Sequence, residues 1–121
     1  MNDARYLRIT MHDNDYTRYI QYVAESLQNI FEYDFICFED GIYSLSEDDF
    51  PELKELIKQM LCATYNVIHK IQSTNEKRDY KKEQEENFGC HLELVDYLDI
   101  PENDNWESVY IPLFDGEIIV R

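Results

Sequence analysis

The apolar residues between 53 and 71 recur at steps of three and four, the spacing that places side chains on one face of an α-helix. Ser46-Glu-Asp-Asp49 resembles a capping box ahead of this stretch, and Pro51 suits a first helical turn. We therefore predict a helix over about 50–72. Its apolar stripe is wide enough to be covered on more than one side: Leu53, Leu56, Ile57, Met60, Leu61, Thr64, Val67, Ile68 and Ile71.

Two other periodic stretches come earlier in the chain. The segment from Tyr6 to His12 alternates apolar and polar residues, as a strand with one buried face does. The next residues, through Asp15, supply turn and N-cap chemistry, so a second helix is expected over about 15–33. Its stripe consists of Tyr16, Tyr19, Ile20, Val23, Leu27, Ile30 and Phe31.

A small hairpin is predicted between the two helices. The β-prone runs 35–38 and 42–45 flank an Asp40-Gly41 pair, and Asp-Gly between such runs is a strong turn signal. The hairpin would present Glu39 and Asp40 at its tip.

Three further strands are expected after the second helix, at 89–96, 107–114 and 117–121. The last two flank Asp115-Gly116, which favours a hairpin with a two-residue type I′ turn. Pro112 cannot donate to a sheet hydrogen bond, so its strand is expected at a sheet edge or with a bulge.

These elements predict a single α+β domain over 1–121, with two helices packed on a mostly antiparallel sheet of about four strands plus a small hairpin. Residues 73–87 have only Tyr80 as an apolar side chain and carry both signs of charge. Without an apolar stripe this segment cannot dock on the core, so we expect a flexible loop or a solvated extension of the preceding helix.

We expect limited trypsin digestion of the free protein to cut first within 73–87, because this segment has almost no apolar surface with which to dock. The cleavage sites would be Lys77, Arg78, Lys81 and Lys82. Mass spectrometry of the early fragments checks this. Protection of all four sites would contradict it.

The charge of the chain limits its partners. With 26 acidic and 11 basic residues, the formal net charge is −15. Binding to nucleic acid depends on Lys and Arg that neutralise phosphates, so direct contact with nucleic acid or anionic lipid is not expected. An apolar content of 44% is too high for a disordered acidic tail. Without a long apolar run, the chain is expected in the cytoplasm and not in a membrane.

Motifs that carry catalysis or hold cofactors are missing from the sequence. The three glycines form neither a G-x-x-x-x-G-K nor a G-x-G-x-x-G pattern, and there is no H-E-x-x-H or G-x-S-x-G. The odd set Cys37, Cys62 and Cys90 lacks a C-x-x-C pair, and we expect reduced, inert thiols. We therefore predict a protein without enzymatic activity, cofactor or metal.

Two weaker patterns suggest a metal site and a nuclease motif, but each also has an ordinary structural explanation. His12, Asp13 and Asp15 could offer ligands to a metal ion, but this composition is also expected where a turn caps a helix. Asp40 with Glu52-Leu-Lys54 loosely resembles the acid and E-x-K set of metal-dependent nucleases. Those nucleases carry E-x-K on a strand, whereas these residues fall in a predicted helix, where positions two apart diverge.

The acidic residues are segregated along the chain. Nine lie between Glu32 and Glu55, offset only by Lys54, and eight lie between Leu92 and Val120 without any Lys or Arg. Five aromatic residues in these segments could serve as desolvated anchors of an interface, although Phe50 and Tyr110 are equally expected in the core: Tyr43, Phe50, Tyr97, Trp106 and Tyr110. We predict a partner-binding surface formed by Glu39, Asp40, Glu47, Asp48, Asp49, Glu52, Asp99, Glu102, Asp104 and Trp106.

The predicted function is that of a small acidic protein that inhibits or sequesters a basic, nucleic-acid-binding protein. Its carboxylates would take the place of phosphates on a basic groove. Anti-restriction and anti-CRISPR proteins of mobile elements, and immunity proteins of nuclease toxins, are similar in size and charge, although no motif matches residue by residue. The alternative is a structural or adaptor domain, dimeric through an edge strand or a tyrosine-rich helix face, whose charge serves solubility.

Overall fold

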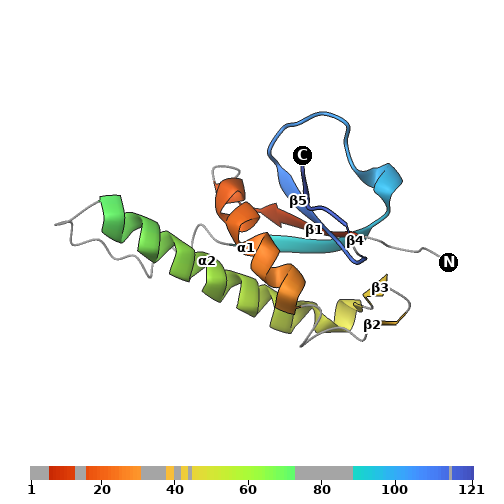
Figure 1. Cartoon of the computed structure of the whole chain (residues 1–121), viewed down its shortest axis with the longest axis horizontal. Helices are drawn as coiled ribbons and strands as arrows, with labels where there is room; N and C mark the ends of the chain where they lie inside the picture. The colour runs from red at the N-terminus through yellow and green to blue at the C-terminus, as the bar shows by residue number, and fades with distance from the viewer. Residues whose placement is uncertain are drawn as a thin grey trace.

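The computed structural model describes residues 6–12, 16–30, 38–39, 42–43, 45–72, 89–114 and 116–121. Two helices lie on one face of a four-stranded antiparallel sheet, which confirms the predicted α+β class (Figure 1). The predicted polar segment 73–87 lies outside the described residues.

The sheet is built around the first strand. Strand β1 (Tyr6–Met11) lies between β4 (Cys90–Val95) and β5 (Ser108–Pro112), and β6 (Ile119–Val120) lies beyond β5. All the neighbouring strands are antiparallel. The alternation predicted from the sequence is confirmed, since Leu7, Ile9 and Met11 are buried on the face toward the helices.

Helices α1 (Thr17–Ile30) and α2 (Phe50–Gln72) pack on that face and on each other. Their buried residues recur at helical spacing, as predicted for both stripes. One member of the predicted α2 stripe is wrong, because Val67 is 59% exposed, and the side chains of Ile68 and Ile71 are not among those described. Asp15 and residues 31–33, at the ends of the predicted first helix, lie outside the described residues. The buried residues are Ile20, Val23, Ala24 and Leu27 in α1, and Leu53, Ile57, Leu61 and Tyr65 in α2.

The small hairpin between the helices is also confirmed. Strand β2 (Phe38–Glu39) pairs antiparallel with β3 (Ile42–Tyr43), so that Glu39 lies opposite Ile42. The Asp40-Gly41 turn itself lies outside the described residues.

The predicted register of the C-terminal hairpin is wrong. A two-residue turn at 115–116 would pair Phe114 with Glu117, whereas the structure pairs Tyr110 with Ile119. The connection is longer because Phe114 turns onto the sheet, with its ring centroid 5.3 Å from that of Tyr6. A Cβ at Gly116 would lie only 2.7 Å from Cε2 of the Phe114 ring, so a larger residue here would require that ring to shift.

The expectation for Pro112 is also corrected, because β5 is an inner strand and not an edge strand. Ser108 exchanges both backbone hydrogen bonds with Arg121, so alternation directs the nitrogen of Pro112 toward the β6 side as well. The pairing with β6 has ended at Tyr110. The missing N–H of Pro112 therefore faces no strand partner, and the proline costs the sheet nothing.

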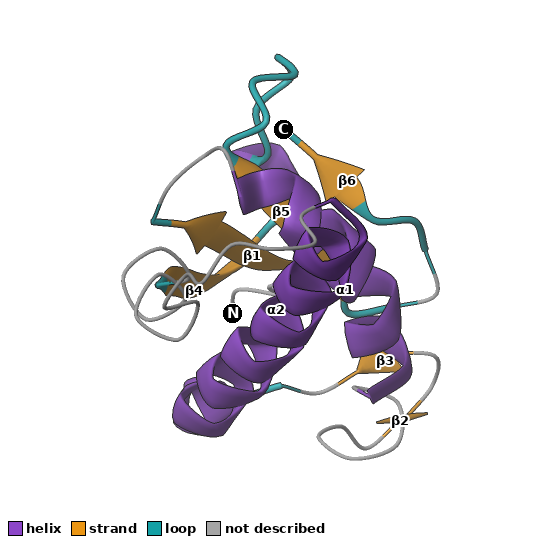
Figure 2. Ribbon diagram, turned by 90° about the vertical axis from the view of Figure 1, so that its left-hand side faces the viewer, coloured by secondary structure: helices purple, strands orange, loops and turns teal. Residues whose placement is uncertain are grey.

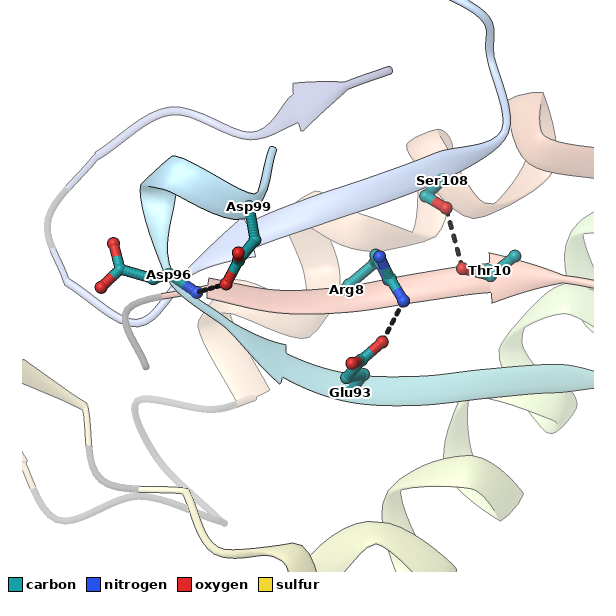
Figure 3. A network of polar contacts seen from close by, with 6 residues as sticks. All are labelled: Arg8, Thr10, Glu93, Asp96, Asp99 and Ser108. Carbon is teal, nitrogen blue, oxygen red and sulfur yellow. Dashed lines mark hydrogen bonds and ion pairs between the residues drawn. The ribbon is translucent and has the colours of Figure 1, made fainter. Parts of the chain in front are cut away.

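The outer face of the sheet, away from the helices, has an apolar end and a polar end. Tyr6, Val95 and Tyr110 form a second buried cluster. At the polar end, Arg8 forms an ion pair with Glu93, and the hydroxyls of Thr10 and Ser108 lie 2.8 Å apart (Figure 3). This face is covered at its apolar end by the segment that follows β4.

Candidate functional site

A single 3₁₀ turn, η4 (Tyr97–Asp99), follows β4 and is closed by its own aspartates. The backbone N–H of Asp96 donates to the Asp99 carboxylate at 3.3 Å, as Figure 3 shows, and the N–H of Leu98 donates to the Asp96 carboxylate at 3.3 Å. The N–H of Asp99 donates in turn to the carbonyl of Asp96 at 3.0 Å. These bonds form a capping box, which holds the short turn in one conformation.

The turn presents two large apolar side chains to solvent. Leu98 is 89% exposed and Tyr97 is 61% exposed, although the Tyr97 ring still lies 6.1 Å from that of Tyr6. Ile100, the next residue in the chain, turns inward and packs against the outer-face cluster. Leu98 and Tyr97 therefore form a small exposed apolar area on an ordered turn.

Residues 101–107 continue from the turn and are all exposed. We call residues 96–107 the acidic loop, since they contain Asp96, Asp99, Glu102, Asp104 and Glu107 and no basic residue. Three of the predicted binding acids, Asp99, Glu102 and Asp104, therefore lie on one loop and in solvent.

The far end of the acidic loop is fixed by Trp106. This residue has a φ of 57°, in the left-handed region that large side chains rarely adopt. The guanidinium of Arg18 on α1 lies 5.5 Å from the centre of the indole ring, a cation–π distance. The N–H groups of Glu107 and Ser108 both donate to the carbonyl of Arg121 at 2.9 Å. Trp106 is 38% exposed and so contributes to the surface while it anchors the loop.

An open cavity of about 240 Å³ lies between the acidic loop and β6. Its walls include Tyr97, Leu98, Ile100, Glu102, Ile119 and Arg121. The cavity combines an apolar wall with one acidic and one basic side chain, so it suits an amphipathic side chain of a protein partner.

Four of the other predicted acids lie at the start of α2, in the 3₁₀ turn η3 (Glu47–Asp49) and just after it at Glu52. The N–H and hydroxyl of Ser46 donate to the Asp49 carboxylate at 3.3 and 3.0 Å, which confirms the predicted capping box. Glu47, Asp48 and Glu52 are exposed. Acids at a helix N-terminus are stabilised by the helix dipole, so these residues have a structural reason to be there.

The two acidic regions do not form one surface. Figures 1 and 2 both place the acidic loop above the sheet and the β2–β3 hairpin and the start of α2 below it, on opposite sides of the molecule. Glu39 lies in β2, and the hairpin that contains it is on the same side of the molecule as the start of α2. Asp40 lies outside the described residues. The structure thus divides the predicted binding residues between two ends.

The aromatic residues considered as anchors also divide. Tyr97 and Trp106 are on the surface, whereas Tyr110 is 2% exposed in the outer-face cluster and Phe50 packs against the main core. The acidic loop therefore combines exposed acids with the exposed side chains of Tyr97, Leu98 and Trp106.

The described part of the chain contains two cysteines, Cys62 and Cys90, and both are half-buried. Burial raises the pKa of the Cys90 thiol, and the nearby Lys54 and Lys58 ammonium groups oppose this shift. Cys90 and His91 are neighbours on β4 and point to opposite faces of the sheet. No group of three potential metal ligands occurs among the described residues, which do not include Asp13 or Asp15. Glu52 and Lys54 lie on a helix, as predicted.

The sequence identified Tyr97 as a possible anchor but not Leu98. A usable signal was present, because Asp96-x-x-Asp99 directly after a strand is a capping-box pattern that turns the two residues between outward. The contact between Arg18 and Trp106 had no sequence signal, since it joins α1 to a loop far along the chain.

Within the described residues, neither helix has the length and apolar content needed to cross a membrane. No protein-family model matches the chain, and no curated protein or solved structure matches it significantly.

Proposed function

We propose that the chain is a binding protein that docks its acidic loop on a basic surface of another protein and thereby inhibits or sequesters that protein. The observation that carries this is the exposure of Leu98 and Tyr97 on a closed turn among carboxylates. Interfaces gain most of their affinity from a few desolvated apolar or aromatic anchors within a polar rim. The acidic loop offers both parts.

Electrostatics indicate the kind of partner. A net charge of −15 disfavours nucleic acid and favours Lys- and Arg-rich surfaces, where it speeds association at low salt. Basic grooves of this kind are common on nucleic-acid-binding proteins, and carboxylates can occupy them in place of phosphates. The capping box that closes the η4 turn supports the proposal, because a surface that is already ordered loses less conformational entropy on docking.

Two variants with matched charge test this in a pull-down from a lysate of the source cells. Glu102→Gln, Asp104→Asn and Glu107→Gln together remove three exposed charges from the acidic loop. Glu47→Gln, Asp48→Asn and Glu52→Gln remove three from the other end of the molecule. Asp99 and Asp49 are kept because they close the two turns. We expect the first variant to lose a basic partner that the parent and the second variant both capture.

Equal capture by all three proteins, with the same elution by salt, would contradict the proposal. Circular dichroism of each variant controls for folding. If only the variant of Glu47, Asp48 and Glu52 loses the partner, the interface lies at the start of α2 and not on the acidic loop.

A further inference from the structure

Strand β4 lies at one edge of the sheet, and no described strand pairs with its outer side. The strand order is β4-β1-β5-β6, and β4 has six residues against two in β6 at the opposite edge. Its sequence, Cys-His-Leu-Glu-Leu-Val, contains neither proline nor lysine. Long, regular edges of this kind pair readily with a strand from another chain.

The hydrogen bonds of β1 show which backbone groups of β4 face outward. The N–H of His12 donates to the carbonyl of Gly89 at 2.7 Å, so Gly89 directs its backbone groups toward β1. Because the direction alternates along a strand, His91, Glu93 and Val95 also face β1. Cys90, Leu92 and Leu94 therefore direct their N–H and C=O groups away from the sheet. No strand in the described part of the chain forms hydrogen bonds with these outward backbone groups.

We infer that a second copy of this chain pairs with β4, in an antiparallel arrangement about a two-fold axis at Leu92. In this register Leu92 pairs with its own counterpart, and Cys90 pairs with Leu94 of the other copy. Every outward N–H and C=O of the three residues then has a hydrogen-bond partner. The two sheets join into one continuous sheet.

Cross-strand side chains favour this register over its neighbour. With the axis at Leu92, His91 lies opposite Glu93 of the other copy, and this contact occurs twice. With the axis at Glu93, two glutamates would face each other and the backbone groups of Cys90 would stay unpaired. Like charges directly opposite one another destabilise a sheet, whereas complementary pairs stabilise it.

Glu93 is the one acidic residue of β4. Glu93 forms an ion pair with Arg8 of its own sheet, so the carboxylate is already partly neutralised. Cys90 and Leu94 are half-buried and Leu92 is buried, and a second strand would cover what remains exposed. The surface is separate from the acidic loop, so this inference does not depend on the proposed function.

Sedimentation equilibrium of the purified chain tests the dimer. We expect a concentration-dependent mass that reaches twice that of the monomer. His91→Glu places a glutamate opposite Glu93 at both symmetric positions and should raise the dimer dissociation constant about tenfold. Gln21→Glu adds the same charge at an exposed site on α1 and should have little effect. Cys90→Pro removes one outward N–H at the first strand residue, where proline is tolerated, and should also weaken the dimer.

Amide hydrogen exchange gives a second measurement that does not depend on a variant. The amides of Leu92 and Leu94 should become protected as the protein concentration rises, while those of His91 and Glu93 are protected throughout. A monomer at all concentrations, or a dimer that neither His91→Glu nor Cys90→Pro weakens, would overturn the inference. Protection of the Leu92 amide in the monomer would do the same.

Discussion

Truncation of Ile57 to alanine is expected to lower the free energy of unfolding by about 3 kcal/mol and the melting temperature by roughly 10 °C. Ile57 is fully buried on α2, in the core shared by both helices and the sheet. The loss combines the transfer free energy of the deleted methyl and methylene groups with that of the cavity left behind. Urea denaturation followed by circular dichroism measures it.

Val67→Ala is the matched control for this prediction. Val67 lies on the same helix but is 59% exposed, and both substitutions replace a β-branched residue with alanine. The gain in helix propensity is therefore shared, and the difference between the variants reports burial. We expect a change of no more than about 0.5 kcal/mol for Val67→Ala. Equal losses from the two variants would mean that the buried face of α2 is wrongly assigned.

Leu98→Ala is expected to weaken the complex with the captured partner roughly thirtyfold, the loss typical of an apolar anchor worth about 2 kcal/mol. Its effect on the stability of the free protein should be within about 0.5 kcal/mol, because a side chain that is 89% exposed contributes little to the core. Surface plasmon resonance with immobilised partner measures the loss.

The kinetics should separate the anchor from the charges around it. Leu98→Ala should mainly raise the dissociation rate, whereas neutralising the loop acids should mainly slow association at low salt. Tyr22→Ala removes another exposed apolar side chain, 72% exposed on α1, and should leave binding unchanged. If Leu98→Ala binds as the parent does, the leucine is not part of the interface.

The elements of the main core could be predicted from the sequence because each has one buried face. Alternation in β1 and the stripes of α1 and α2 record that burial directly, and the faces observed are the ones predicted except at Val67, which is exposed. The short β2–β3 hairpin followed from its Asp-Gly pair in the same way.

The register of the last hairpin could not be predicted because it depends on a contact distant in sequence. Asp115-Gly116 favours a tight turn locally, but the packing of Phe114 against Tyr6 moves the pairing by two residues. The inner position of β5 has the same origin. Strand β5 is an inner strand because it pairs with β1 on one side and β6 on the other, and the local sequence of 107–114 does not indicate these partners.

The candidate site was predicted in part. The acids of the acidic loop were identified from charge segregation alone, whereas the exposure of Leu98 depended on the capping box that orients it. The separation of the two acidic regions is a consequence of tertiary structure, since η4 follows the outer end of β4 while α2 covers the opposite face (Figure 1).

The salt dependence of affinity tests the central claim most directly. The dissociation constant for the captured partner should be measured from low to physiological salt, where charges are screened beyond roughly 8 Å. The measurement uses the parent, the acidic-loop variant Glu102→Gln/Asp104→Asn/Glu107→Gln and the α2 variant Glu47→Gln/Asp48→Asn/Glu52→Gln. If the acidic loop binds a basic surface, the first variant binds more weakly with a shallower salt slope, and the second follows the parent. Identical constants and slopes for all three proteins would show that the acidic loop does not form the interface.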